Sequence, residues 1–302
     1  MSPYAVLQPR LRWSMPQAWR QQRDCEWGRV NMRGRKLGCF LEGPCFERSG
    51  HLHVVDIPFG RIFRISEAGD WELRCAYDGW PNGLKVHRDG SLYIADYKRG
   101  LLRLEGDQRE PETVAGSFRS EGFKGCNDLS FSESGDLYFT DQGQTGLHDP
   151  TGRVFRQDAQ GKLTLLLDNV PSPNGLVMNS DETQLLVAVT RANAIWRLPL
   201  MDDGTVSKVG LFIQLSGGLA GPDGLALDAA GGLLVCHPGI GVWRFDPLGR
   251  PTHLVPAPEG SVWTNIAFGV GNEFELYIVD SVAGAIHCVD MPYAGKALPI
   301  RG

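Results

Sequence analysis

Short apolar segments alternate with turn sequences along the whole chain, and no long stretch places apolar residues at the helical spacing of about 3.6 residues. The apolar segments are rich in Val, Ile, Leu, Tyr and Phe, which favour strands, and turn sequences such as RDG, ESG and AAGG separate them. The pattern therefore predicts an all-β protein built from many short strands.

These segments recur with a period of 40 to 49 residues. Each repeat opens on a phrase such as SPNGLVMN (from Ser172) or GPDGLALD (from Gly221), with looser copies WPNGLKVH (from Trp80) and GCNDLSFS (from Gly125). The polar residue in third position, here called the third-place residue, is in turn Glu42, Asn82, Asn127, Asn174, Asp223 and Asn265. A second segment opens 10 or 11 residues later on a leucine, at Leu52, Leu92, Leu137, Leu185, Leu233 and Leu276.

A third strand-like segment follows in every repeat, as in GRIFRI and NAIWRL, and a fourth follows in most. Three or four short strands repeated six times predict a six-bladed β-propeller, with four-stranded antiparallel blades around a central channel. We expect residues 1–302 to form this one domain, with an N-terminal extension of about residues 1–37 partly closing the ring. The segment GRVNMRG, from Gly28, is predicted to add a strand to the last blade, because closure removes two open sheet edges.

The third-place residues are predicted to form a ring at one end of the channel, since the innermost strands of a propeller lie beside its axis. All six can offer oxygen, and two are carboxylates. Asn or Asp before Gly is also an ordinary turn signal. Six matching positions, one of them the glutamate Glu42, favour a functional ring. Asn82 and Asn265 are predicted to be turn residues or to contact the metal ligands without binding the metal.

Oxygen donors without sulfur or imidazole are typical of sites for hard cations. Calcium accepts six to eight oxygens in flexible geometry, whereas magnesium requires a tight octahedron. We therefore predict one divalent cation, with Ca²⁺ favoured and Zn²⁺, Mg²⁺ and Mn²⁺ as alternatives.

Composition and charge exclude several other functions. A net charge of −5 and a pI near 5.8 argue against nucleic-acid binding. No apolar run reaches the roughly 18 residues that would cross a membrane, and residues 1–23 lack the apolar core of a secretory signal. The seven cysteines are scattered without a CxxC pair, which argues against a zinc or redox motif and favours free thiols in the cytoplasm.

The phrases LEGPCF, LHVVDIPFGRIFRI, GCNDLSF, SPNGLVMN and GPDGLALD together resemble the senescence-marker-protein (regucalcin)/gluconolactonase/LRE-like family. That family includes regucalcin, bacterial aldonolactonases and diisopropylfluorophosphatase-like hydrolases. The resemblance covers about residues 38 to 290. It implies a six-bladed propeller with one divalent metal ion, commonly calcium, in the central pocket.

Carried over by motif, the resemblance implies that Glu42, Asn174 and Asp223 bind the metal. Asn127, in the ND phrase, is implied to contact metal, metal-bound water or substrate. Asp223 is also the candidate general base or nucleophile. Regucalcin-like members carry a substrate-binding arginine just before the ND phrase, whereas this chain has Lys124 two residues ahead of Cys126. The resemblance therefore specifies the metal site more closely than the substrate.

Further contacts to substrate are expected from connections around the same mouth. Phe59, Lys124, Arg191 and Trp263 lie on such connections, each with surface or packing as the alternative role. His237 stands where Asp56, Asp96 and Asp141 stand in their own repeats, and it has either a substrate-binding or a structural role. The three aspartates are predicted to cap the turn after the second strand.

The favoured function is a metal-dependent, gluconolactonase-like hydrolase that opens a small lactone. The sequence contains no GxSxG, HExxH, P-loop or dinucleotide motif to support a different catalytic mechanism. The alternatives are a metal-dependent phosphotriesterase or aryl-esterase of the same fold, and a non-catalytic binding scaffold. A condensing propeller like strictosidine synthase fits less well, since such proteins rely on a glutamate in a late blade. Neither nucleic acid nor membrane is an expected partner.

Overall fold

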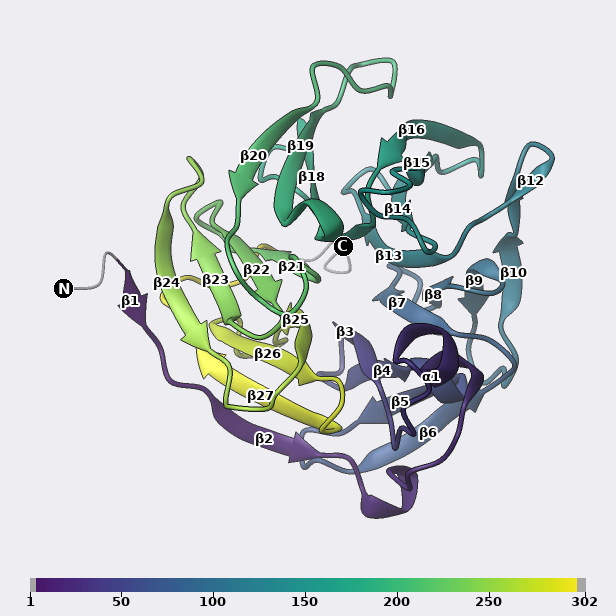
Figure 1. Ribbon diagram of the computed structural model, residues 1–302, viewed down its shortest axis with the longest axis vertical. Coiled ribbons are helices and arrows are strands. Elements are labelled where there is room, and N and C mark those ends of the chain that lie inside the picture. Colours follow the sequence, from purple (N-terminus) through teal and green to yellow (C-terminus); the bar gives the residue numbers. More distant parts are fainter. Residues whose placement is uncertain (1–3, 298–302) are drawn as a thin grey trace.

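The computed structural model of the protein describes residues 4–297 and shows six sheets arranged around a central axis (Figure 1). The innermost strands are β3 (Leu41–Phe46), β7 (Pro81–Val86), β13 (Cys126–Phe131), β17 (Pro173–Met178), β21 (Leu225–Leu227) and β25 (Trp263–Phe268). The ring is continuous, because β25 packs against β3. The predicted six-bladed propeller of four-stranded antiparallel blades is therefore confirmed.

The second segment of each repeat forms the next strand of its blade, and the predicted leucine lies in every one: β4 (Leu52–Asp56), β8 (Leu92–Asp96), β14 (Leu137–Asp141), β18 (Gln184–Val189), β22 (Leu233–His237) and β26 (Glu275–Asp280). The third strands are β5 (Arg61–Ile65), β9 (Gly100–Leu104), β15 (Gly152–Gln157), β19 (Ala194–Pro199), β23 (Gly241–Phe245) and β27 (Ala285–Asp290). Blades one to five add β6 (Trp71–Ala76), β10 (Glu112–Ala115), β16 (Leu163–Val170), β20 (Gly210–Gln214) and β24 (Pro251–Pro256). A hairpin of β11 (Ser117–Phe118) and β12 (Glu121–Gly122) follows blade two.

Ring closure differs from the prediction. The outer strand of the sixth blade is β2 (Arg10–Ser14), antiparallel to β27, and β1 (Ala5–Val6) adds a parallel strand to β24. The segment from Gly28 was wrongly predicted as a strand, because Glu26–Asn31 form helix α1. The Sγ of Cys25 caps α1 by accepting the backbone N–H of Gly28 at 3.3 Å. In β2, the buried Trp13 ring stacks on Tyr277 with a centroid distance of 5.5 Å.

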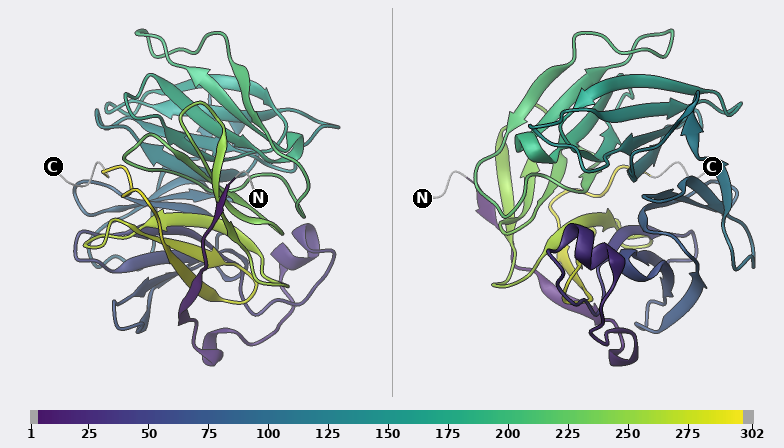
Figure 2. Two further views of the ribbon diagram at one scale, coloured as in Figure 1. Left: turned by 90° about the vertical axis from the view of Figure 1, so that its left-hand side faces the viewer. Right: turned by 45° about the vertical axis from the view of Figure 1, so that its right-hand side comes forward.

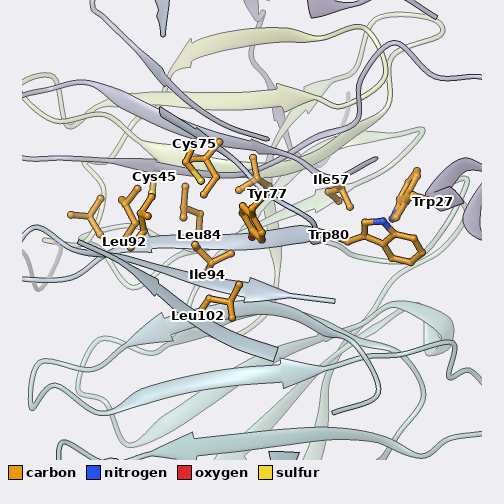
Figure 3. Close-up of a cluster of buried hydrophobic side chains, with 14 of the residues drawn as sticks. Trp27, Cys45, Ile57, Cys75, Tyr77, Trp80, Leu84, Leu92, Ile94 and Leu102 are labelled. Carbon is orange, nitrogen blue, oxygen red and sulfur yellow. The ribbon is translucent and has the colours of Figure 1, made fainter. Parts of the chain in front are cut away.

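The hydrophobic core is divided among the spaces between neighbouring blades. Figure 3 shows one such cluster, between the first two blades, where residues of β3 to β6 face β7 to β9. Its labelled members are Trp27, Cys45, Ile57, Cys75, Tyr77, Trp80, Leu84, Leu92, Ile94 and Leu102. Trp27 belongs to α1, so the helix is anchored on this core rather than on a sheet edge. No helix within residues 4–297 is both long and apolar enough to span a bilayer.

The glycine that follows a third-place residue lets adjacent inner strands approach closely. A Cβ added to Gly83 would lie 2.7 Å from the backbone oxygen of Asn127, and one on Gly175 would lie 2.4 Å from that of Asp223. A Cβ added to Gly224 would lie 2.1 Å from the side-chain Oδ1 of Asn265. The repeated NG and DG phrases therefore have a packing function at the glycine and leave the preceding side chain free for another role.

The aspartates that end the second strands are buried, and they differ in what they bind. Asp96 accepts the backbone N–H groups of Lys98 and Arg99, as predicted for a turn cap. Asp56 and Asp141 instead accept a backbone N–H from the segment that leads into their own inner strand, and each pairs with an arginine of the third strand, Asp56 with Arg61 and Asp141 with Arg153. The turn-cap prediction is therefore correct for Asp96 and wrong for the other two, because an arginine on the third strand draws their carboxylates across the blade.

Candidate functional site

The third-place residues all lie at the start of an inner strand or, for Asp223, two residues before β21. The end of the channel that they surround is here called the polar mouth. Helix α1 lies at this face of the ring, whereas the described C-terminal segment crosses the opposite face (Figure 2). Glu42, Asn127, Asn174 and Asn265 are buried, while Asn82 and Asp223 are partly exposed.

Glu42 is held in place by its neighbours in the ring. Its Oε2 accepts the backbone N–H of Gly43 at 2.8 Å and the amide Nδ2 of Asn265 at 2.8 Å. The Oδ1 of Asn265 accepts the backbone N–H of Ile266. Both polar atoms of Asn265 are thus used inside the protein, and its role is to orient Glu42 from the neighbouring blade.

Asp223 lies on the fifth blade, separated from the blade of Glu42 only by the sixth, and is fixed through its backbone. Its N–H donates to the Cys236 carbonyl at 2.9 Å, and the following Gly224 N–H donates to the Thr264 carbonyl of the next blade. The Asn174 side chain hydrogen-bonds the Asp223 carboxylate. Burial raises the pKa of Asp223 well above its usual range, and the charge of Glu42 raises it further.

Asn127 is connected to the fourth blade by a chain of amides and hydroxyls. Its Nδ2 donates to Oε1 of Gln142 at 2.9 Å, and the Nε2 of Gln142 donates to the Ser172 hydroxyl at 2.9 Å. The backbone N–H of Ser172 in turn donates to the Thr145 hydroxyl. This chain uses the amide N–H group of Asn127 and leaves its oxygen as the atom available for a cation or a ligand.

A third carboxylate, Asp128, belongs to the same cluster and was missed in the sequence. It is buried and its charge raises the pKa of both Glu42 and Asp223, while burial raises its own. The signal was present in the phrase GCNDLSF, where Asp128 occupies the position that is glycine in the other NG and DG phrases. A carboxylate at a position where the other phrases need glycine for close packing indicates that the carboxylate itself has a function.

The chemical type of the donors suits a hard divalent cation, although residues 4–297 contain no group of three or more His, Cys, Asp or Glu side chains placed to hold a metal ion. The cluster combines the carboxylates of Glu42, Asp128 and Asp223 with asparagine amides, and it has neither sulfur nor imidazole donors among its ring members. Glu42 and Asp128 are buried and Asp223 is partly exposed, and neighbouring carboxylates repel one another, so their ionised forms are costly without a positive charge. A calcium-type ion would supply that charge to oxygen ligands.

This arrangement predicts a pH-dependent stability for the metal-free protein. Burial raises the pKa of Glu42 to about 7 in the folded chain, from 4.5. The folded state therefore holds more protons than the unfolded state between these values, and the free energy of unfolding falls as pH rises through that window. In chelator, we expect the melting temperature to fall by several degrees from pH 5 to pH 7.5.

The matched variant Glu42→Gln removes this titration and should show a shallower dependence on pH. Added Ca²⁺ should raise the melting temperature of the unaltered protein more at pH 7.5 than at pH 5, because the ion binds the deprotonated carboxylates. Scanning calorimetry of both proteins makes the measurement. Identical pH profiles for the two proteins would contradict the assignment of the slope to Glu42.

The predicted substrate contacts lie at different depths around the polar mouth. Arg191, in the short 3₁₀ helix η3 (Thr190–Ala192), is exposed, and its charge lowers the pKa of Asp223. Lys124 donates from Nζ to the Thr151 hydroxyl on the rim. Phe59 lies between the guanidinium groups of Arg23 and Arg61, at 3.9 and 4.9 Å from its ring centre. Arg191 is therefore the basic residue of this set whose charge reaches the carboxylate cluster.

His237 and Trp263 are both fully buried, and Trp263 lies in the core between the last two blades. His237 Nε2 contacts the Gly217 carbonyl at 3.2 Å, whereas its Nδ1 and the Nε1 of Trp263 have no hydrogen-bond partner within residues 4–297. Trp263 packs with the His287 ring inside the interblade core. Their burial favours the structural alternative for both side chains, and a contact to substrate stays a prediction.

Helix α1 contributes to the rim of the polar mouth, which the sequence did not indicate. The side chain of Gln144 donates to Oδ1 of Asn31 at 3.0 Å and to the Tyr97 hydroxyl at 2.8 Å. These bonds connect α1 with blades two and three. The rim is thereby built from the N-terminal extension as well as from the repeats.

Comparison with known proteins identifies relatives of the whole propeller. The model of the SMP-30/Gluconolactonase/LRE-like region matches residues 40–282. A gluconolactonase of Zymomonas mobilis is 34% identical over 259 residues, covering 76% of this chain and 72% of the relative. Lactonase drp35 of Staphylococcus saprophyticus is 29% identical over 233 residues, covering 74% and 71% of the two chains.

Two solved structures share the fold closely. A gluconolactonase from Xanthomonas campestris superposes with a TM-score of 0.75 at 24% identity, covering 84% of this chain and 86% of the other. The calcium-binding protein regucalcin from Agrobacterium tumefaciens superposes with a TM-score of 0.73 at 21% identity, covering 97% of each chain. At these identities the superpositions support the fold alone.

Proposed function

Because the chain belongs to the SMP-30/gluconolactonase/LRE-like family, whose model matches residues 40–282, we propose that it is a lactonase that acts at a divalent cation. Its curated relatives include a gluconolactonase and lactonases, which supports hydrolysis of a small lactone. Glu42, Asn174 and Asp223 are the proposed cation ligands, with Asn127 as a further ligand or a substrate contact. Ca²⁺ is the proposed ion, since a structural relative is a calcium-binding protein.

The observation that carries the proposal is the cluster of mutually destabilising carboxylates at the polar mouth. A scaffold that only bound a partner would gain nothing from placing Glu42, Asp128 and Asp223 close together, because the charge of one raises the cost of ionising its neighbours. A bound cation would stabilise the ionised carboxylates, so the repulsion among them would favour its binding. When bound, it would supply Lewis-acid polarisation of the substrate carbonyl.

Asp223 is the proposed base or nucleophile. As a base, it would take a proton from the attacking water while the water oxygen bonds to the lactone carbonyl carbon. The ring C–O bond then breaks, and the leaving alkoxide recovers the proton to give a hydroxy acid. As a nucleophile, an Asp223 oxygen would itself attack that carbon and the ring C–O bond would break, so that an acyl-enzyme anhydride forms; water would then hydrolyse the anhydride, returning the carboxylate and giving the hydroxy acid. The hydrogen bond from Asn174 orients the carboxylate for either role.

Arg191 is proposed to bind the substrate. Its charge reaches Asp223 from an exposed 3₁₀ helix beside the polar mouth, so it could pair with a hydroxyl or carboxylate oxygen of the substrate. Lys124 is held by Thr151 farther out on the rim and would contact only a larger substrate.

The proposal is tested by hydrolysis of a panel of γ- and δ-lactones. We expect turnover that falls by on the order of 100-fold or more in chelator, because polarisation of the carbonyl contributes several kcal/mol, and that returns with Ca²⁺. Hydrolysis that is indifferent to chelator would refute the metal dependence. Turnover of organophosphates or aryl esters in the absence of lactone hydrolysis would assign the chain to the alternative hydrolase class.

A cytoplasmic location is also proposed. The seven cysteines lie within the described residues and are all free thiols. Free and mostly buried cysteines suit a reducing compartment.

A further inference from the structure

A cavity lies at the opposite end of the channel from the polar mouth. It has a volume of about 140 Å³, and residues near the ends of all six inner strands line it. The described C-terminal segment closes part of it, because the N–H of Lys296 donates to the Leu227 carbonyl at 2.8 Å. We call this space the far cavity.

The walls of the far cavity are mainly apolar. The inner strands contribute uncharged side chains at Cys45, Phe46, Leu176, Val177, Leu225 and Ile266. Lys85, on β7, is the charged residue that these strands themselves contribute to the wall. An apolar cavity with one cation is suited to a ligand with an apolar body and one negative group.

The other charged groups of the far cavity are already used by the protein. Lys296 donates from Nζ to the Asn179 carbonyl and to Glu182, each at 3.2 Å. Arg88 donates to the Glu133 carbonyl at 3.0 Å. Lys296 is therefore paired with an acid, whereas Arg88 is an exposed side chain that donates to a backbone carbonyl.

Lys85 is different. It is half-buried in the channel wall, and its ammonium makes no hydrogen bond or ion pair with any residue of the part of the chain that the structure describes. It lines the far cavity, and its charge also lowers the pKa of Asp128 and of Cys45.

We propose that the far cavity binds a small monocarboxylate with an apolar body of about the size of a benzene ring, with its carboxylate on Lys85. An apolar cavity of about 150 Å³ is known to hold benzene, which matches the space available. A carboxylate would give the half-buried ammonium a charge-assisted partner. The site is separate from the polar mouth and does not depend on lactonase activity.

Titration calorimetry with benzoate tests the proposal. We expect Lys85→Met to weaken benzoate binding by about tenfold or more, the usual loss for a hydrogen bond to a charged group. The matched control Lys296→Met should change it by less than about threefold, because Lys296 is already paired. Benzyl alcohol, which lacks the charge, should not distinguish Lys85→Met from the unaltered protein. Lys85→Gln, which keeps a polar end, replaces Lys85→Met if that variant unfolds.

Binding must also be located at the correct end of the channel. Glu42→Gln alters the polar mouth and should leave benzoate affinity unchanged. Loss of benzoate binding in Glu42→Gln, or equal binding by Lys85→Met and the unaltered protein, would overturn the proposal. Binding seen only in a variant that ends at Ala297 would overturn it as well, because the chain's own C-terminal residues would then be the occupant.

Discussion

Replacing Asp223 with asparagine is expected to lower kcat for lactone hydrolysis by about a thousandfold. The change removes the base or nucleophile, and a positioned proton acceptor alone contributes roughly 100- to 10,000-fold. It also removes a carboxylate from the cation cluster, so the stabilisation of the protein by Ca²⁺ should weaken. Steady-state kinetics and calorimetric melting with and without Ca²⁺ measure the two effects.

Asp246 supplies a matched control. It lies in the same blade, beyond the end of β23, where it is hydrogen-bonded to Arg250. Asp246→Asn should leave kcat within about twofold, since the residue lies away from the polar mouth and surface changes have small effects. If Asp223→Asn retained more than a tenth of the activity, Asp223 would be neither base nor nucleophile.

The two roles of Asp223 can be separated by isotope labelling. Turnover in ¹⁸O-water should label the carboxylate of Asp223 if its own oxygen attacks the lactone, since water then cleaves the acyl-enzyme at that carboxyl group. A base that only removes a proton keeps its oxygens. Mass spectrometry of the peptide that contains Asp223, after many turnovers, measures the incorporation of ¹⁸O and so distinguishes the two roles.

Gly175→Ala is expected to cost about 3 kcal/mol of stability, at the upper end of the range for overpacking in a well-packed region. The added Cβ would lie 2.4 Å from the Asp223 carbonyl oxygen, 2.8 Å from the Gly224 Cα and 2.9 Å from the Leu225 N. All three are backbone atoms, so the neighbouring strand must move as a unit. In a chain of this size we expect a fall of about 5 °C in the melting temperature.

The same displacement moves Asp223. We therefore expect kcat/KM to fall at least about tenfold, because a misplacement of about 1 Å can cost a catalytic group on the order of 100-fold in rate. Gly122→Ala is the matched control, because a Cβ there has no atom within 4 Å. That variant should melt within about 2 °C of the unaltered protein. A Gly175→Ala protein that is equally stable and active would show that the inner strands are not packed against each other as described.

Much of the fold followed from local pattern. The second strand of each blade is buried on both faces and is therefore a short run of apolar residues, and glycine recurs in the turns, so both leave a signal in the sequence. The repeat was visible because each blade packs on its neighbours in the same way, and the leucine 10 or 11 residues after each third-place residue marks the same interblade contact. Glu42 and Asp223 were identifiable as ring members because they occupy equivalent positions.

Ring closure was not predictable in the same way. The segment from Gly28 contains alternating residues that suit a strand, yet Trp27 is buried against Phe40 and the first blade, and this contact favours a helix. The strand β2 that closes the ring lies earlier in the chain, and the burial of Trp13 on Tyr277 depends on a partner more than 260 residues away. Contacts between distant segments leave no local signal.

The sequence by itself determined the number of blades, the position of every inner strand and the polar character of the residues around one end of the channel. It could do so because each blade packs in the same way and therefore needs the same residue types at the same spacing. Only the tertiary structure decided which of those residues act together. It joined Asn265 to Glu42, turned Asp128 into a third member of the carboxylate cluster and left Lys85 without a partner. Charge and hydrogen bonding act over a few ångströms in space, and the chain separates these residues by as many as 223 positions.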